Sequence, residues 1–247
     1  MIKLTVIIPT LNEESNIQRA LDSVFFADEI IVIDSYSTDG TVKILKNNNV
    51  TLLQRKFDDF SSQKNYAIKQ ASNDWVLMID ADEEVTIELG KEIKNILSKE
   101  LSAVGFYIKR NNFVENKRLN YGGYSSKIVR LFNKNHCFYK GIVHETILTT
   151  GKLENLVGRI NHYTYKDYNQ FKKKMNYYAI LRAQELFLKG NRVTFFHLYI
   201  KPFVRFLIHY VIKLGFLDGK KGIVFSYLMA YGVSKRYKEL IILLNNK

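Results

Sequence analysis

The first hundred residues alternate short apolar runs with amphipathic segments, and this alternation limits the folds open to the chain. The apolar runs have the length and β-branched composition of strands, and the segments between them have helical periodicity. Repeated strand–helix units form a parallel sheet with helices on both faces. We therefore predict an α/β fold, with strands over 4–8, 29–33, 50–53 and 75–79 and helices near 14–26, 41–48 and 61–72.

From residue 101 the pattern changes to short strands and turns, and from residue 166 it becomes helical. We expect three regions, over 1–100, 101–165 and 166–247. The middle region should complete a mixed sheet, with strands over 104–110, 126–132 and 159–163 and a turn at 121–124. The last region should contain helices at 167–189, 193–214 and 220–244.

The net charge of +13 is concentrated in the last third of the chain. Residues 1–162 hold 21 Lys and Arg against 20 Asp and Glu, so residues 163–247 hold 16 against 4. Such a basic region can bind nucleic acid, anionic lipid or an acidic substrate, and the sign of the charge does not choose among them.

Cysteine content and the amino-terminal residues bear on the cellular compartment. The one cysteine, Cys137, excludes an internal disulfide and a zinc site made of cysteines alone, so a reducing compartment is expected. The apolar run over 4–8 ends at Pro9 and does not have the form of a secretory signal. We therefore expect a cytoplasmic protein.

The clearest local signal is an apolar run that leads directly into clustered carboxylates, Val-Leu-Met-Ile-Asp-Ala-Asp-Glu at residues 76–83. Asp80 and Asp82 stand at a predicted strand end, where two carboxylates can converge on Mg²⁺ or Mn²⁺. The alternative is that these acidic residues cap the helix that begins near Thr86. The metal interpretation is favoured because the predicted sheet has neither a G-x-G-x-x-G turn nor a G-x-x-x-x-G-K-[ST] loop to hold phosphate.

The second predicted strand also leads into polar residues. Asp34 follows its apolar part, where a carboxylate can accept hydrogen bonds from a nucleoside. Asp39 is better interpreted as a cap of the helix that starts at Thr41.

Together these motifs resemble the family 2 glycosyltransferases of the GT-A fold. The resemblance is carried by four segments in the family's order and spacing, at residues 5–14, 34–41, 64–65 and 80–83. One departure lies in the second segment, where Ser35-Tyr36 stands in place of the family's common Asp-Gly.

The resemblance implies a GT-A nucleotide-diphospho-sugar transferase fold, a Rossmann-like mixed sheet flanked by helices, with a C-terminal helical extension. Residues 1–100 would then be the nucleotide-sugar-binding half, 101–165 the acceptor-binding half and 166–247 the basic amphipathic extension. The implied nucleoside pocket consists of Pro9, Asn12, Glu13 and Asp34. Lys64 is implied to lie close to the nucleotide, and Asp80 and Asp82 to serve the ribose, the diphosphate and a divalent metal, Mn²⁺ or Mg²⁺.

The segment Gly-Ile-Val-His-Glu at residues 141–145 extends the resemblance to a bacterial subgroup typified by lipopolysaccharide-core β-1,4-glucosyltransferases. In a loop, neighbouring His and Glu side chains can converge, and a surface ion pair is the alternative. We expect His144 to face the metal or diphosphate and Glu145 to take the proton from the acceptor hydroxyl, with the reverse assignment open. His162 is a further candidate ligand, with a buried, hydrogen-bonded histidine as the alternative.

Between residues 193 and 214 the chain is apolar except for a basic residue every four positions: His197, Lys201, Arg205, His209 and Lys213. On a helix of 3.6 residues per turn these residues form a slanting stripe. Its three firmly charged residues oppose a transmembrane span. We expect a helix lying in the interface of an anionic membrane; the alternative is a helix packed on the α/β domain with its basic edge in water.

Three functional hypotheses follow. The first is a metal-dependent, inverting bacterial glycosyltransferase, peripheral on the inner membrane, that transfers a hexose such as glucose from a UDP-linked donor to a lipopolysaccharide-core or other glycan or glycolipid acceptor. The second is a sugar nucleotidyltransferase, which the absence of a Gly-rich phosphate loop after the first strand disfavours. The third is a nucleic-acid-binding protein, which the apolar continuity of the basic region disfavours, so we expect no nucleic acid partner.

Overall fold

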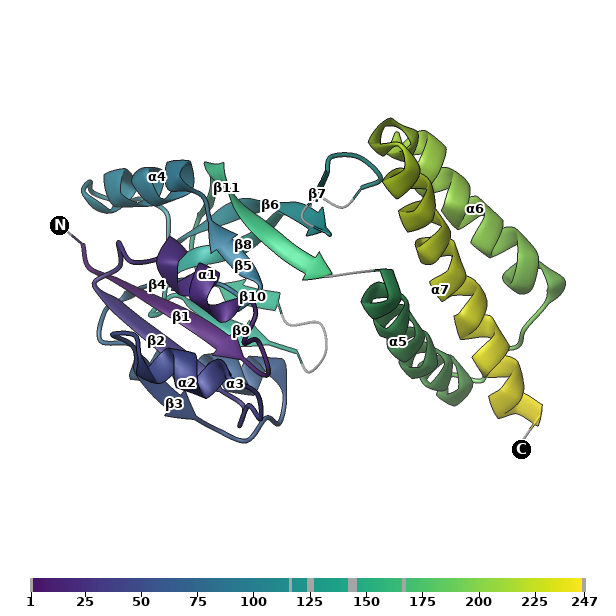
Figure 1. The fold of residues 1–247 in the computed structure, drawn as a ribbon, viewed down its shortest axis with the longest axis horizontal. Helices are drawn as coiled ribbons and strands as arrows, with labels where there is room; N and C mark the ends of the chain where they lie inside the picture. The colour runs from purple at the N-terminus through teal and green to yellow at the C-terminus, as the bar shows by residue number, and fades with distance from the viewer. Residues whose placement is uncertain (1, 116, 124–126, 142–145, 166–167, 246–247) are drawn as a thin grey trace. The chain divides into compact units, whose positions relative to one another are not determined.

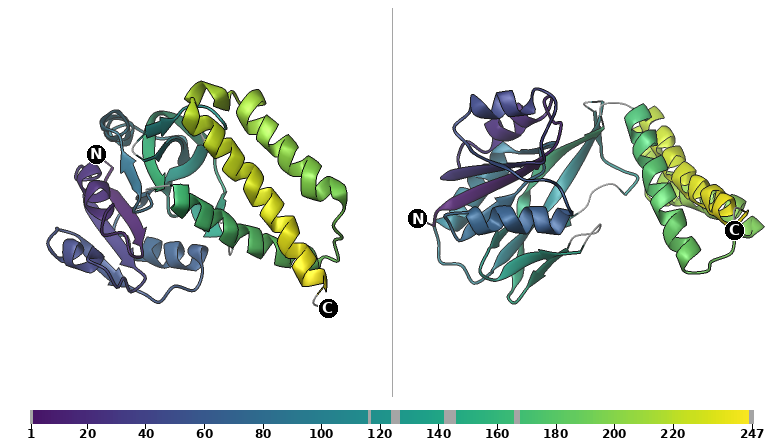
Figure 2. Two further views of the ribbon diagram at one scale, coloured as in Figure 1. Left: turned by 45° about the vertical axis from the view of Figure 1, so that its right-hand side comes forward. Right: turned by 90° about the horizontal axis from the view of Figure 1, so that it is seen from below.

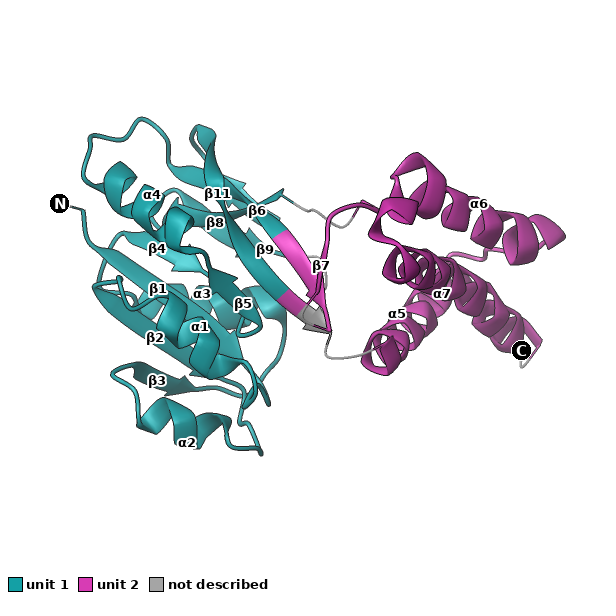
Figure 3. Cartoon of the chain, turned by 45° about the horizontal axis from the view of Figure 1, so that its top comes forward, with its two compact units in different colours: residues 1–110, 126–162 teal, residues 111–125, 163–247 magenta. Residues whose placement is uncertain are grey.

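The structure is a computed structural model that describes residues 2–115, 117–123, 127–141, 146–165 and 168–245. It consists of two compact units (Figure 3). Unit 1 comprises residues 1–110 and 126–162, and unit 2 comprises residues 111–125 and 163–247. The segment 111–125 thus groups with the C-terminal helices.

A mixed sheet forms the centre of unit 1 (Figure 1). Its first strands are parallel, in the order β3 (Thr51–Gln54), β2 (Glu29–Asp34), β1 (Leu4–Thr10) and β4 (Trp75–Met78). The order reverses at β1, because β2 lies on one side of β1 and β4 on the other. In open α/β sheets a ligand binds beyond the carboxyl ends of the strands at such a reversal.

The other half of the sheet continues beyond β4 with β8 (Lys127–Asn133), β6 (Gly105–Val114), β11 (Leu153–Tyr165) and β5 (Glu83–Val85). β8 is antiparallel to both β4 and β6, and β5 is antiparallel to β11. β7 (Lys117–Leu119) pairs with β6, and β9 (Cys137–Lys140) pairs with β10 (Thr146–Thr149). The predicted strands are therefore confirmed, whereas the short strands β5, β7, β9 and β10 were not predicted.

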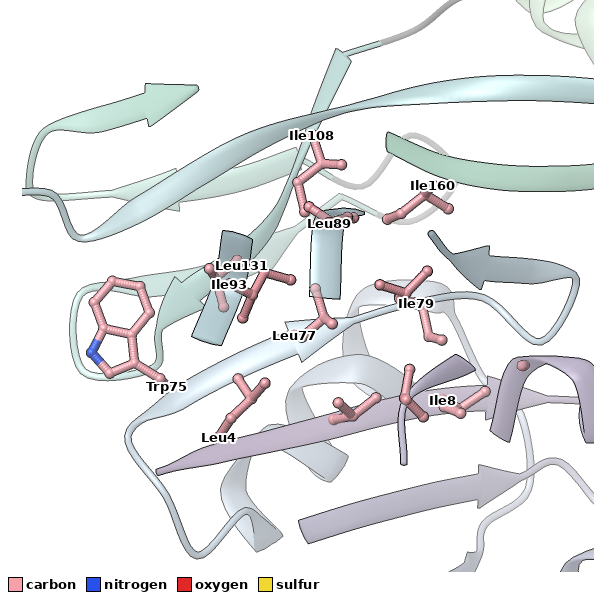
Figure 4. Packing of buried hydrophobic residues seen from close by; sticks show 14 of the residues in the cluster. Leu4, Ile8, Trp75, Leu77, Ile79, Leu89, Ile93, Ile108, Leu131 and Ile160 are labelled. Carbon is pink, nitrogen blue, oxygen red and sulfur yellow. The ribbon is translucent and has the colours of Figure 1, made fainter. Parts of the chain in front are cut away.

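Helices cover both faces of the sheet in unit 1, as the views in Figure 2 show. α1 (Ile17–Ser23), α2 (Thr41–Lys46) and α4 (Ile87–Leu97) contribute to one apolar cluster, and α3 (Phe60–Gln70) contributes to another. Successive residues of β1 alternate between the clusters: Val6 and Ile8 lie in the first and Ile7 in the second. Figure 4 shows Ile8, Leu77 and Leu89 in the first cluster.

Unit 2 is helical apart from its strand segments. α5 (Tyr168–Leu188) and α7 (Lys220–Asn245) pack together, with the rings of Phe171 and Phe225 4.6 Å apart. The predicted helix over 193–214 is a continuous run of η1 (Phe196–Ile200), α6 (Lys201–Leu207) and η2 (Ile208–Ile212), in which π-helical turns flank an α-helical centre. The short helix η3 (Gly215–Asp218) then leads to α7.

The predicted basic stripe is only partly present in unit 2. His209 is 3% exposed and its Nδ1 lies 2.6 Å from the carbonyl oxygen of Gly122, so it belongs to the interior and not to an exposed stripe. The four-residue spacing of the basic residues cannot predict the burial of His209, because that burial depends on the loop that covers the side chain. Within the described residues, no helix is both long enough and apolar enough to cross a membrane.

Candidate active site

The loops that follow β1 and β2 are joined by hydrogen bonds between backbone and side chains. The Asn12 amide donates to Ser37 Oγ at 2.8 Å, and the Asn12 side-chain oxygen accepts from the Thr38 amide at 2.8 Å. The Glu13 amide donates to Thr41 Oγ1 at 2.9 Å. Two of the residues predicted for the nucleoside pocket, Asn12 and Glu13, therefore lie side by side with the second motif.

Asp34 lies at the end of β2 and is fully buried. Its carboxylate accepts from the Ser37 amide at 3.0 Å, from Ser37 Oγ at 2.5 Å and from Gln54 Nε2 at 3.2 Å. Pro9, the penultimate residue of β1, stands opposite Ile33 in the parallel register. Hydrogen bonds within the protein thus orient the Asp34 carboxylate at the carboxyl end of β2.

Tyr36 occupies the position where the family commonly has glycine, and it shows why glycine suits this turn. Its φ is +65°, in the left-handed region that disfavours side chains with a Cβ. The side chain is 55% exposed. The chain therefore places a large aromatic ring in solvent beside Asp34 by accepting a strained backbone.

The acidic motif after β4 surrounds an arginine that comes from β8. Arg130 Nη2 lies 2.5 Å from Asp80 Oδ2 and 2.8 Å from Glu83 Oε1. Glu83 is fully buried and accepts from the Asp80 amide at 3.0 Å, while Arg130 is 5% exposed and Asp80 is 34% exposed. Arg110 approaches Glu83 at 3.4 Å. This network fixes the loop that carries Asp80 and Asp82.

Lys64, on α3, adds a second cation to the same carboxylate. Its Nζ lies 3.6 Å from Asp80 Oδ1 and 5.1 Å from the ring centre of Tyr139. The neighbouring Asn65 has a structural role, because its amide group exchanges hydrogen bonds with the backbone of Tyr139 at 2.8 and 3.0 Å. Burial alone would raise the pKa of Asp80, but Arg130 and Lys64 outweigh it and hold that pKa below its usual range.

Asp82 points to a different partner. Its Oδ2 lies 3.3 Å from Nε2 of His162, which stands on β11 directly opposite Glu83 of β5. Both side chains are partly exposed, so a carboxylate oxygen and an imidazole nitrogen are presented beside Asp80. These donors fit a divalent cation such as Mn²⁺ or Mg²⁺. A preassembled group of three or more metal-binding side chains is absent from the described part of the chain.

The structure excludes the interpretation in which the acidic motif caps α4. The N-cap of α4 is Thr86, whose side chain accepts from the Leu89 amide. Asp80 and Asp82 are therefore not capping residues. Asp39 does serve the start of α2, since it accepts from the Thr41 amide at 3.0 Å, although Gly40 occupies the N-cap position itself.

Sequence reasoning missed two members of this site, Glu83 as a buried anchor and Arg130 as its partner. A signal for Arg130 was present: one basic residue stands within the apolar run Ile-Val-Arg-Leu-Phe of β8. His144 and Glu145 lie outside the described residues, so their predicted roles stay predictions.

The mixed sheet, its reversal of strand order and its flanking helices constitute the predicted GT-A fold, and the class of protein that this fold and acidic edge define is the glycosyltransferases. The sequence profile of the family described as Glycosyl transferase family 2 matches residues 5–205. An uncharacterized glycosyltransferase of Rickettsia typhi is 30% identical, over 97% of this chain and 87% of its own. The chain belongs to glycosyl transferase family 2.

Two further proteins are similar along nearly the whole chain. LpsC of Rhizobium meliloti, a lipopolysaccharide core biosynthesis glycosyltransferase, is 26% identical, over 95% of this chain and 93% of its own. The crystal structure of residues 1–349 of TarS from S. aureus has a TM-score of 0.50 and 18% identity, covering 100% of this chain and 92% of that one, and it supports the fold. Family membership favours the glycosyltransferase hypothesis over the nucleotidyltransferase hypothesis.

Proposed function

We propose that this glycosyltransferase moves a hexose, such as glucose, from a UDP-linked donor to a lipopolysaccharide-core or other glycolipid acceptor, with inversion at the anomeric carbon. The observation that carries the proposal is the acidic edge beyond β4, where Asp80 and Asp82 lie beside Lys64, Arg130 and His162. The proposed division of labour gives donor binding to residues 1–100 and acceptor binding to residues 101–165.

The donor half is suited to a nucleoside diphosphate. Asn12, Glu13 and Asp34 lie in loops that are already held together by hydrogen bonds, so a nucleoside would meet ordered polar groups. Lys64 lies beside the Asp80 carboxylate and brings a positive charge to the edge where the diphosphate is proposed to bind. Pro9 is proposed to line the same pocket.

Asp82 and His162 are the described residues best placed to hold a divalent cation, with Asp80 beside them and His144 as a proposed further ligand. When bound, the cation supplies positive charge that stabilises the departing diphosphate. Arg130 and Glu83 act through Asp80: both hold its loop in place, and Arg130 also keeps its carboxylate ionised.

The acceptor hydroxyl is proposed to lose its proton to Glu145 as its oxygen attacks the anomeric carbon. The bond from that carbon to the donor phosphate oxygen breaks, and the nucleoside diphosphate leaves on the opposite side of the sugar. A lipopolysaccharide-core acceptor is supported by the similarity to LpsC, whose name refers to that biosynthesis.

The helices of unit 2 are proposed to hold the enzyme on the cytoplasmic face of an anionic inner membrane. Residues 163–247 carry 16 Lys and Arg against 4 Asp and Glu. Large apolar side chains are also exposed along the run from η1 to η2, among them Phe196, Tyr199, Phe203 and Ile212. Basic and apolar groups on one helix are typical of binding at a membrane interface.

A donor screen tests the proposed transfer. Each sugar nucleotide is incubated with the enzyme and Mn²⁺, and release of nucleoside diphosphate by slow hydrolysis is measured with and without chelator. We expect release from a UDP-hexose that chelator suppresses. Release from a donor with another nucleobase, or release unaffected by chelator, would contradict the corresponding part of the proposal.

A further inference from the structure

A groove in unit 2 lies between the run η1–α6–η2 and α7, which Figure 1 shows side by side. Its volume is about 370 Å³. The walls combine three cationic side chains, Lys201, Arg205 and Arg236, with apolar ones such as Val204, Ile208 and Val233. None of the described residues that line this groove is acidic.

Of the three cations, Lys201 is held by contacts within the groove and Arg236 is half-buried. Lys201 Nζ donates to the Tyr237 hydroxyl at 3.0 Å and lies over the Phe196 and Tyr237 rings, 5.9 and 5.2 Å from their centres. Arg236 is half-buried, and its Nε has no hydrogen-bond partner among the described residues although the atom is buried. A buried donor without a partner is destabilising, and this guanidinium belongs to a residue that lines the groove.

The surroundings of Arg236 are rich in positive charge. Burial lowers the pKa of its guanidinium, and Arg182 and Arg205 lower it further, while Tyr237 and Glu185 act in the opposite direction. Glu185 is already paired with Arg182 and Lys189. An anion placed in the groove would offset the repulsion among these arginines.

The surface beside the groove indicates which kind of anion fits. Tyr199 and Phe203 are each 60% exposed, and the groove residues Phe196 and Val204 are themselves exposed. A free phosphate gains no stabilisation from apolar walls. A lipid, in contrast, would place its phosphate among the cations and its acyl chains along these side chains.

We propose that this groove binds the phosphate of an anionic membrane lipid. The site rests on the membrane attachment proposed above and assigns that attachment to Arg205 and Arg236, whose guanidinium groups can donate paired hydrogen bonds to phosphate oxygens. Nucleic acid phosphates are disfavoured because the cations form one compact cluster with apolar walls and not a track along which a strand could lie.

Vesicle flotation tests the proposal with the full chain. Vesicles of phosphatidylcholine alone, and of phosphatidylcholine with phosphatidic acid, are compared for the parent, Arg205→Gln with Arg236→Gln, and a control, Lys173→Gln with Lys238→Gln. Both double variants remove two charges from unit 2, and the control lysines are exposed and do not line the groove. We expect the parent to bind the anionic vesicles, the groove variant to bind about tenfold or more weakly, and the control to bind nearly as the parent does.

Single variants keep the test valid if the double variant folds poorly. Arg236→Lys retains the charge but loses the paired donors. Phosphate recognition therefore predicts that this variant binds vesicles more weakly than the parent, whereas attraction by net charge predicts unchanged binding. Arg205→Gln alters only an exposed side chain. The thermal midpoint of each variant checks its folding.

The outcomes separate failure of the site from failure of the function. If the groove and control variants lose binding equally, net charge alone attracts the membrane, and the lipid site is wrong while the attachment stands. If the parent ignores anionic vesicles, both attachment and site are wrong. Competition by inorganic phosphate as effective as that by phosphatidic acid vesicles, or tighter binding to a single-stranded oligonucleotide, would also overturn the lipid assignment. Donor hydrolysis by the parent tests the transferase independently.

Discussion

In unit 1 the buried Arg130 lies against two carboxylates, whereas in unit 2 the half-buried Arg236 lies beside two other arginines. In the first arrangement Asp80 and Glu83 compensate the charge of Arg130, although its buried Nε, like that of Arg236, has no hydrogen-bond partner among the described residues. The second leaves positive charge to be compensated from outside. Unit 1 thus has its polar geometry set before a ligand arrives, while unit 2 has the charge pattern of a surface that receives an anion.

The largest expected effect in unit 1 is the loss of transfer in Asp82→Asn. Its carboxylate is proposed to serve the cation, and apart from His162 no partner of its side chain is found among the described residues, so the fold should tolerate the change. Product formation and the thermal midpoint are measured on the same sample. Asp22→Asn, an exposed acid on α1, serves as the control. Full activity of Asp82→Asn in the presence of chelator would rule the proposed role out.

Glu145→Gln should reduce transfer by about 10² to 10⁴, the usual range for one positioned proton acceptor. Donor affinity, measured by calorimetry, should be retained because the residue is proposed to act on the acceptor. Glu154→Gln is the matched control, since Glu154 pairs with the exposed Lys152. A Glu145→Gln enzyme that transfers normally, or that cannot bind donor, removes Glu145 from this role.

Replacing each arginine by methionine tests the contrast between the units directly. Arg130→Met should lower the free energy of unfolding by about 3–5 kcal/mol, because it leaves the fully buried Glu83 without its closest cation. Arg236→Met should leave that free energy unchanged or raise it, because it removes a half-buried charge that lies near Arg182 and Arg205 and has no ion pair among the described residues. Denaturant titration of both variants measures the two values. Equal destabilisation would show that the units do not differ in this way.

The smallest expected effect concerns backbone strain, compared at one large exposed apolar or aromatic residue of each unit. Tyr36 in unit 1 and Leu214 in unit 2 have φ values of +65° and +58°. At each position the glycine variant should exceed the alanine variant in unfolding free energy by about 1 kcal/mol, because only glycine adopts this conformation without strain. Thermal denaturation compares the pairs. Alanine variants as stable as the glycine variants would mean that these turns relax.

The parallel half of the sheet was predictable because its strands are apolar runs separated by helical periodicity, so local sequence determines them. The strands β5, β7 and β9 were missed because they are short and partly charged, as in Lys-Arg-Leu of β7, and only their partners make them strands. The same limit applies to the site. Asp80 and Asp82 are separated by one residue and were found, whereas Arg130 reaches Asp80 and Glu83 from 50 and 47 residues away and was not.

The hydrogen bonds that join the loops after β1 and β2 have a consequence for amide exchange with solvent. The amides of Asn12, Glu13 and Thr38 each donate to a side-chain acceptor on the opposite loop. These amides should exchange slowly even without donor, and donor binding should slow them little further. The conformational entropy of these loops is therefore lost during folding and not during binding, so each catalytic cycle can release its nucleoside diphosphate without the loops becoming disordered.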